Sequence, residues 1–97
     1  MLSATQTLIL QLLRGAGPQY GLELVRASEG ELKKGTVYVT LSRMCDKGLV
    51  SVERDDEAGE HPGMPRPRYR ATADGLAALE AQQAWAAAMR MNHETTG

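Results

Sequence analysis

A regular pattern of apolar positions organises the chain between residues 32 and 50. Four side chains recur there at i, i+4, i+7 and i+8, which places them on one stripe of an α-helix: Val37, Leu41, Met44 and Cys45. The opposite face of that helix mixes small, apolar and charged side chains: Thr36, Val39, Arg43, Asp46 and Lys47. The segment is therefore predicted to be a helix that packs by one face and exposes the other.

The residues after this helix predict a strand. Gly48 follows the last periodic residue and Lys47 lies in the last turn, a combination that ends a helix at a glycine C-cap. From Leu49 to Val52 the period changes from 3.6 to 2, and residues 51–54 are predicted to pair with residues 68–72 around a charged loop. This order is that of a winged helix-turn-helix, whose helix enters the DNA major groove while the hairpin touches the flanking backbone.

Two further helices are predicted before this segment. Residues 3–6 read Ser-Ala-Thr-Gln, which fits a capping box, and a broad apolar stripe follows: Leu8, Ile9, Leu10, Leu12 and Leu13. We expect this helix to end at Arg14, before Gly15-Ala16-Gly17-Pro18. Its broad stripe indicates two contact surfaces, with a deeply buried helix as the alternative. A second helix is predicted over residues 20–28, where Gly21 is a poor helix former that close backbone packing would explain.

The last predicted helix has two apolar faces. Thr72 is its expected N-cap, the helix runs to about Met91, and residues 92–97 are expected to fray. Leu76 and Leu79 point one way, and four side chains point nearly the opposite way: Ala78, Ala81, Trp85 and Met89. Two apolar faces need two neighbours, and the second is most simply the same helix of another copy. The predicted fold is mainly α (α+β): a winged helix-turn-helix over 1–72 and a C-terminal dimerisation helix over 73–93, in one compact domain.

Composition and charge narrow the function. The 97 residues form one small domain without Phe, so its thin core favours help from a partner subunit. The net charge of −1 argues against a simple basic nucleic-acid binder, but the charges are segregated. Residues 33–54 carry five bases and two acids, residues 55–60 carry four acids, and Arg66, Arg68 and Arg70 follow. A single cysteine and the lack of an apolar run of about 20 residues predict a cytoplasmic protein without membrane association.

The exposed face of the central helix and the second half of the loop supply the candidate contacts with double-stranded DNA. An arginine such as Arg43 can bind guanine O6 and N7 together, and Val39 can lie against a thymine methyl. Cations at the start of the helix would hold phosphate beside its free N–H groups. Each residue singly could be an ordinary exposed side chain. The candidate DNA-binding residues are Lys33, Lys34, Thr36, Tyr38, Val39, Thr40, Arg43, Lys47, Arg66 and Arg68.

The sequence carries no pattern typical of catalysis. Cys45 flanks the core stripe, which favours a buried, inert thiol over a redox sensor. His61 and His93 are isolated, without the spacing of metal ligands. We therefore expect no catalytic residues, no metal, no cofactor and no enzymatic activity.

Five short motifs, in order, resemble the PadR family of bacterial transcription regulators. They are Tyr20-Gly21-Leu22-Glu23-Leu24, Lys34-Gly35-Thr36-Val37-Tyr38, Leu41-Ser42-Arg43-Met44, Asp46-Lys47-Gly48-Leu49-Val50 and Arg68-Tyr69-Arg70-Ala71-Thr72-Ala73-Asp74-Gly75. The resemblance covers about residues 5–80. The chain departs from the family in having Lys33-Lys34 in place of the usual Ser-Pro, Val39 where Pro is common, and an acidic wing tip.

The resemblance implies a homodimer that binds a palindromic operator and represses transcription. Short members of this family dimerise through the last helix together with the first, so the expected interface residues are Leu8, Leu10, Ala78, Ala81, Trp85 and Met89. Some members bind planar apolar ligands between those helices, which would make Trp85 a stacking partner for a small apolar or aromatic effector. The alternative is a Trp85 that fills the dimer interface.

A second hypothesis from another class is a winged helix that binds proteins and not specific DNA. The net negative charge and the acidic wing tip favour it, whereas Arg43, Lys47 and the arginines at 66–70 oppose it.

Overall fold

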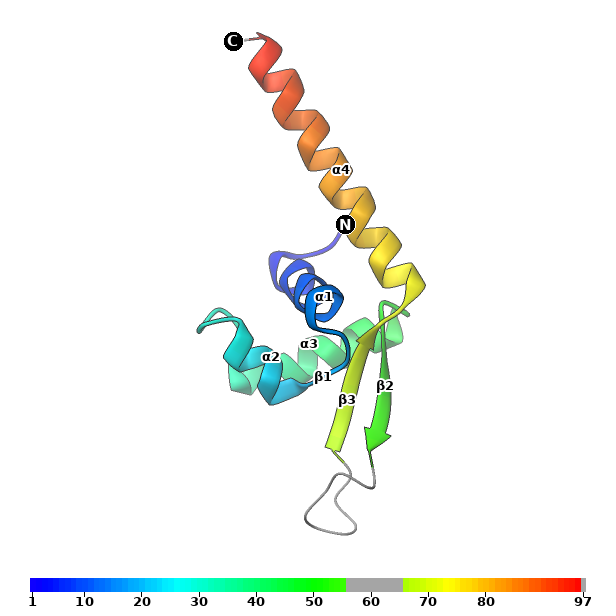
Figure 1. The fold of residues 1–97 in the computed structure, drawn as a ribbon. Coiled ribbons are helices and arrows are strands. Elements are labelled where there is room, and N and C mark those ends of the chain that lie inside the picture. The colour runs from blue at the N-terminus through cyan, green and yellow to red at the C-terminus, as the bar shows by residue number, and fades with distance from the viewer. Residues whose placement is uncertain (56–65, 97) are drawn as a thin grey trace.

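The computed structural model describes residues 1–55 and 66–96, without the side chains of 54, 55, 66 and 92–96. The elements are α1 (Ala4–Ala16), β1 (Gln19–Tyr20), α2 (Gly21–Ala27), α3 (Lys34–Asp46), β2 (Val50–Asp55), β3 (Arg66–Ala71) and α4 (Ala73–Thr96). Helices α1 to α3 gather beside the sheet, and α4 projects away from them (Figure 1). The expected winged helix-turn-helix with a C-terminal helix is confirmed.

The sheet has one strand more than the sequence predicted. Strands β2 and β3 pair antiparallel, with Val52 opposite Tyr69, as expected for the wing. The short strand β1 adds to the other edge of β3, which gives the order β1-β3-β2. Tyr20, expected inside the second helix, therefore lies in β1 opposite Arg68 and directly precedes α2.

The predicted helix starts are confirmed by their hydrogen bonds. At α1 the Gln6 amide donates to Ser3 Oγ over 3.1 Å, and the Ser3 amide donates to Gln6 Oε1 over 3.0 Å. At α4 the Gly75 amide donates to Thr72 Oγ1 over 2.9 Å. Two helices are longer than predicted: α1 continues past Arg14 to Ala16, and α4 continues past Met91 to Thr96.

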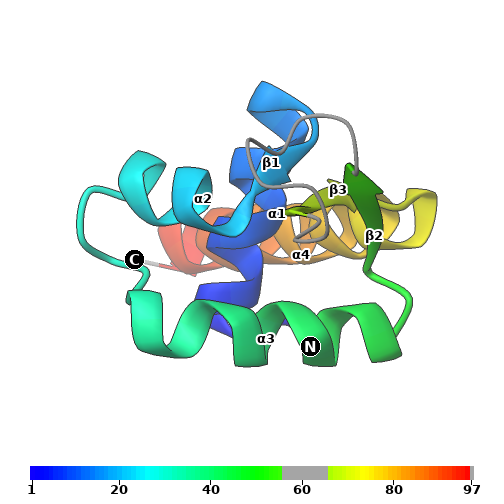
Figure 2. The same ribbon diagram turned by 90° about the horizontal axis from the view of Figure 1, so that it is seen from below.

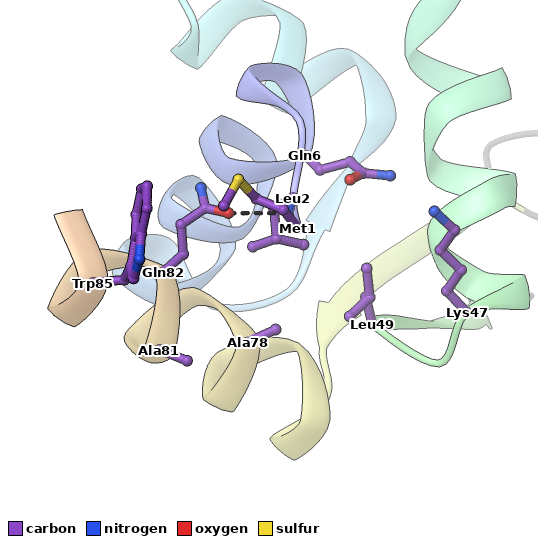
Figure 3. A pocket seen from close by; sticks show the side chains of 9 residues that line it. All are labelled: Met1, Leu2, Gln6, Lys47, Leu49, Ala78, Ala81, Gln82 and Trp85. Carbon is purple, nitrogen blue, oxygen red and sulfur yellow. Dashed lines mark hydrogen bonds between the residues drawn. The ribbon is translucent and has the colours of Figure 1, made fainter.

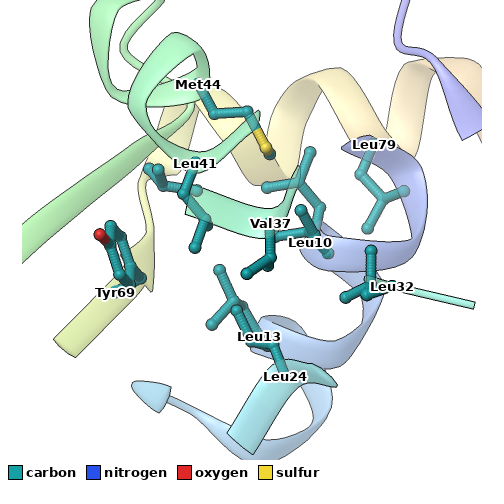
Figure 4. Close-up of a cluster of buried hydrophobic side chains, with 11 residues drawn as sticks. Leu10, Leu13, Leu24, Leu32, Val37, Leu41, Met44, Tyr69 and Leu79 are labelled. Carbon is teal, nitrogen blue, oxygen red and sulfur yellow. The ribbon is translucent and has the colours of Figure 1, made fainter. Parts of the chain in front are cut away.

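One cluster of buried apolar side chains joins all the main elements (Figure 4). The α3 stripe contributes Val37, Leu41 and Met44, and Leu79 is the contribution of α4. The full cluster is Ile9, Leu10, Leu13, Leu24, Leu32, Val37, Leu41, Met44, Val50, Tyr69 and Leu79. Because Leu79 is fully buried against the other helices, the first turns of α4 share the core of the DNA-binding part.

Leu10 corrects one prediction about the dimer interface. Its side chain has no exposed surface and lies beside Gly75 at the start of α4. The broad stripe of α1 thus covers the chain's own last helix at this position, so Leu10 is core and not a surface for a second copy.

The turn between α2 and α3 is fixed by a buried hydroxyl. Ser28 Oγ donates to the Val25 carbonyl over 2.7 Å and accepts the Leu32 amide over 2.9 Å. Between them Glu29 and Gly30 adopt positive φ angles of 54° and 96°. This bridge sets where α3 begins relative to α2. In the described parts of the chain, none of the helices has the length and hydrophobicity needed to cross a bilayer.

Candidate nucleic-acid interface

Helix α3 lies along one edge of the molecule with α1 and α2 on its inner side (Figure 2). Its outer face carries Thr36, Val39 and Arg43, all exposed, and residue Val39 keeps 53% of its surface open to solvent. The Thr40 hydroxyl donates to the Thr36 carbonyl over 3.2 Å and is half-buried at the edge of this face. The opposite face of α3 packs in the core, so the helix is held in place while Val39 and Arg43 stay exposed. Side chains of these two types can contact base edges in the major groove.

The start of α3 combines positive charge with backbone donors. Lys33 is the N-cap, and its side chain makes no capping hydrogen bond; Lys34 is the first helical residue. Both lysines are exposed, and the described first turn of α3 holds no acidic residue. Cations normally avoid a helix N-terminus, so the pair lowers helix stability slightly unless an anion approaches.

Tyr38 lies on the side of α3 that faces α2. A Cβ at Gly21 would come within 2.6 Å of the Tyr38 ring, so the ring rests directly over the first turn of α2. The expected reason for the glycine, close packing, is confirmed, and Tyr38 is what packs there. Residue Tyr38 keeps 41% of its surface exposed.

Arg68 is held on the sheet and not extended from it. Its guanidinium donates to the Tyr20 hydroxyl over 2.8 Å and lies 4.9 Å from the centre of the Tyr20 ring. Nearby, Arg70 forms an exposed ion pair with Glu53 on β2. The Arg66 side chain and residues 56–65, with the acidic loop tip and His61, lie outside the described part of the structure.

Lys47, expected on the reading face, lines a surface cavity of about 550 Å³ (Figure 3). One wall is the end of α3 with Leu49, and the other is α4 with Trp85; the α1 end closes it. The lining residues are Met1, Leu2, Gln6, Lys47, Leu49, Ala78, Ala81, Gln82 and Trp85. Lys47 is the only charged side chain among these nine.

Helix α4 leaves a second surface open. The residues Trp85 and Met89 keep 54% and 50% of their surface exposed, and Ala81 is also exposed. Three more alanines that the sequence reasoning did not name are exposed along the same helix: Ala77, Ala84 and Ala88. Leu8 of α1 is half-buried and packs against the core. On the inner side, Gln82 Nε2 donates to Thr7 Oγ1 over 2.8 Å, which ties α4 to α1.

The described residues hold no group of three or more His, Cys, Asp or Glu side chains that could bind a metal ion. Burial, and secondarily the charge of Asp46, raise the pKa of the Cys45 thiol above its ordinary value. This fits a packing role for Cys45 beside the core cluster.

The model of the transcriptional regulator PadR-like family matches residues 9–81, from α1 through the first turns of α4. The chain belongs to this family. It is therefore a DNA-binding transcriptional regulator and not an enzyme. A comparison with curated proteins gives no significant match.

Solved structures agree with membership of the PadR-like family. A PadR family regulator from Clostridium difficile R20291 is 27% identical, with 98% of this chain and 100% of that chain covered at a TM-score of 0.74. A PadR family regulator from Eggerthella lenta is 29% identical, with 93% and 78% covered and a TM-score of 0.74. BpsR of Bordetella bronchiseptica, whose DNA binding is regulated by 6-hydroxynicotinic acid, is similar in fold at 24% identity, with 94% and 60% covered and a TM-score of 0.75.

Sequence reasoning missed several interactions in this PadR-like chain. No local pattern marks the pairing of Arg68 with Tyr20, because it depends on the two-residue strand β1. The position of Lys47 in the cavity was also missed, although its place at the extreme end of the helix was a usable signal. The contact of Thr72 with the end of α3, described below, joins residues that are 24 apart in the sequence.

Proposed function

We propose that the chain is a cytoplasmic homodimeric repressor that binds a palindromic operator with one α3 in each half-site. The exposed outer face of α3, beside the β2–β3 hairpin, carries this proposal. Arg43 would pair with a guanine in the major groove, and Val39 and Thr36 would contact neighbouring base edges. Bound at a promoter, such a dimer would exclude the transcription machinery.

The ends of the interface would contact phosphate. Lys33 and Lys34 flank the free N–H groups at the start of α3, where a phosphate would relieve the unfavourable placement of two cations. Tyr38 and Thr40 border the reading face, and Arg66 and Arg68 belong to the wing strand. Arg68 would act from its place against Tyr20, which limits how far it can swing.

The open face of α4 supports dimerisation. Trp85 and Met89 are large apolar side chains with about half of their surface unburied in a single chain. Small alanines such as Ala81 and Ala84 beside them would let a second helix approach closely. In a twofold dimer this α4 face of one copy would cover the same face of the other, and Ala78 and Leu8 would lie at the edge of the interface. The two α3 helices would then face adjacent half-sites.

The cavity beside Trp85 would bind an effector that releases the operator. Its apolar walls and the Trp85 ring suit a planar aromatic molecule, and Lys47 would pair with an acidic substituent. The regulation of BpsR by an aromatic acid, 6-hydroxynicotinic acid, supports this choice of chemistry. The alternative, in which Trp85 only fills the dimer interface, predicts that no such ligand changes operator binding.

The test is selection of bound sites from random duplex DNA, followed by titrations on the selected site and on unrelated duplex. Arg43→Ala should cost about 1–3 kcal/mol on the selected site and little on unrelated duplex. Lys34→Ala should weaken both duplexes alike and lower the salt slope by about one unit, because it removes a phosphate contact.

Two results would count against the proposal. Selection that yields no common sequence would favour a winged helix that binds proteins. An unchanged site preference in Arg43→Ala would mean that α3 does not read bases.

A further inference from the structure

The end of α3 and the start of α4 meet at one junction. Helix α3 closes at Gly48, which has a positive φ of 76°, and the Leu49 amide donates back to the Met44 carbonyl over 2.9 Å. This is the hydrogen-bond pattern of a glycine-terminated helix. The turn leaves the Gly48 and Leu49 carbonyls pointing toward the chain that enters α4.

One hydroxyl connects the two helices. Thr72 Oγ1 donates to the Gly48 carbonyl over 2.6 Å and accepts the Gly75 amide over 2.9 Å. The Thr72 amide also donates to the Leu49 carbonyl over 3.1 Å. The N-cap of α4 is thus hydrogen-bonded to the C-terminal turn of α3. Capping α4 uses only the acceptor oxygen of the hydroxyl, so the bond that its proton makes to Gly48 is an additional link between the two helices.

Backbone packing holds the same place. A Cβ at residue 75 would press into the Leu49 carbonyl oxygen, so only glycine lets the first turn of α4 lie this close to the turn after α3. On its inner side Gly75 contacts Leu10 of the core. We call Gly48, Leu49, Thr72 and Gly75 the α3–α4 junction.

We propose that Thr72 is a positioning residue that fixes the angle between α3 and α4 and thereby the spacing of the two half-sites that a dimer can bind. The inference rests on the proposed function. If α4 pairs with its copy, the distance between the two α3 helices depends on how each α3 is set against its own α4. A tilt of about 10° at the junction, acting over about 20 Å, shifts α3 by about 3.5 Å, which is close to one base-pair step.

The test compares three variants at position 72. Thr72→Ser keeps both the donor and the cap, Thr72→Val loses both, and Thr72→Asp keeps an acceptor that can cap α4 but has no proton for Gly48. Binding is measured on duplexes whose half-sites are separated by the selected distance or by one base pair more or less. A single half-site duplex serves as the reference.

We expect the wild type and Thr72→Ser to prefer the selected spacing by about tenfold, a discrimination typical of one misplaced contact in a site. In Thr72→Val and Thr72→Asp this preference should shrink to about threefold or less, with little change on the single half-site. Ser3→Ala is the matched control, since it removes the cap of α1 and should lower the unfolding midpoint without changing the spacing preference. If Thr72→Val and Thr72→Asp instead lose the same factor of affinity on all three spacings, so that the preference of the wild type is kept, the proposal is overturned.

A second measurement needs no DNA. Trp85 is the only tryptophan and serves as the energy donor. A dye attached to Ser42→Cys on α3 is the acceptor, and Cys45→Ala removes the native cysteine so that only this position is labelled. Time-resolved energy transfer between the two then reports the α3–α4 distance. The labelled chain is mixed with excess unlabelled Trp85→Phe chain, so that transfer between copies is suppressed. A wider distance distribution in Thr72→Val and Thr72→Asp than in Thr72→Ser supports the junction, and equal widths refute it. If the wild type shows no selective DNA binding, the proposed function fails while this measurement still decides the role of Thr72.

Discussion

Replacing Trp85 by alanine is predicted to weaken the proposed dimer strongly without unfolding the chain. Residue Trp85 keeps 54% of its surface exposed in one chain. A tryptophan buries up to about 250 Å², so a partner can still cover about 130 Å² of it. At about 25 cal/mol per Å² that burial contributes about 3 kcal/mol per chain, or about 6 kcal/mol for the two copies of a twofold dimer.

The dissociation constant should therefore rise by about 1,000-fold or more, because alanine keeps part of the contact and each 1.4 kcal/mol is a factor of ten. Alanine is also the best helix former, so α4 itself loses nothing by the change. Sedimentation velocity between nanomolar and micromolar concentrations measures the shift, and urea unfolding checks that the chain stays folded. The matched control is Glu80→Ala, which is exposed on α4 about 140° around the helix from Trp85. A change of less than about threefold for Trp85→Ala would refute this face as the interface, since the burial estimate is far larger.

Three other predictions follow from described contacts. Leu79→Ala should lower the free energy of unfolding by about 2–5 kcal/mol in urea, because Leu79 is fully buried, and a loss no larger than that of half-buried Leu76→Ala would contradict this. Gly21→Ala should displace the Tyr38 ring and weaken operator binding while the unfolding free energy changes by about 1 kcal/mol or less; unchanged binding would argue against a DNA contact by Tyr38. Because the Cys45 pKa is raised, its thiolate is scarce at pH 7, so alkylation by iodoacetamide should be slow there and speed up as pH rises toward that pKa; fast labelling at pH 7 would show an exposed thiol.

Local patterns were sufficient to predict the helices that carry their own signals. The stripe of Val37, Leu41 and Met44 is buried as expected, and Gly48 does end the helix with a positive φ. Thr72 caps α4 because its hydroxyl accepts an amide three residues later, an interaction that a short sequence window contains. The outer face of α3 follows from the same periodicity, since residues opposite a buried stripe must be exposed.

The features that sequence missed depend on distant partners. Leu10 lies on a stripe too wide for one neighbour, and only the packing of α4 decides that it faces the chain's own Gly75. Strand β1 consists of two residues and exists only because β3 offers an unpaired edge. Lys47 belongs by periodicity to the reading face, but the arrival of α1 and α4 beside the helix end places it in a cavity. None of these three features can be predicted from the residues next to it in the sequence.

The way α4 joins the core has a consequence for how such a regulator can diversify. Among the described side chains, the core takes only Leu79 from α4, and polar links to α1 come from Gln82 and Gln83. Among the described residues of α4 beyond Gln83, which we call the outer segment (84–91), none belongs to the buried core cluster. If α4 pairs with its copy as proposed, duplicated copies of the gene could change this outer segment without altering the core, and so stop pairing with each other, while α3 continued to recognise the same sequence. Conversely, α3 could acquire a new target while the outer segment kept the old pairing, so the two properties can be inherited and altered independently.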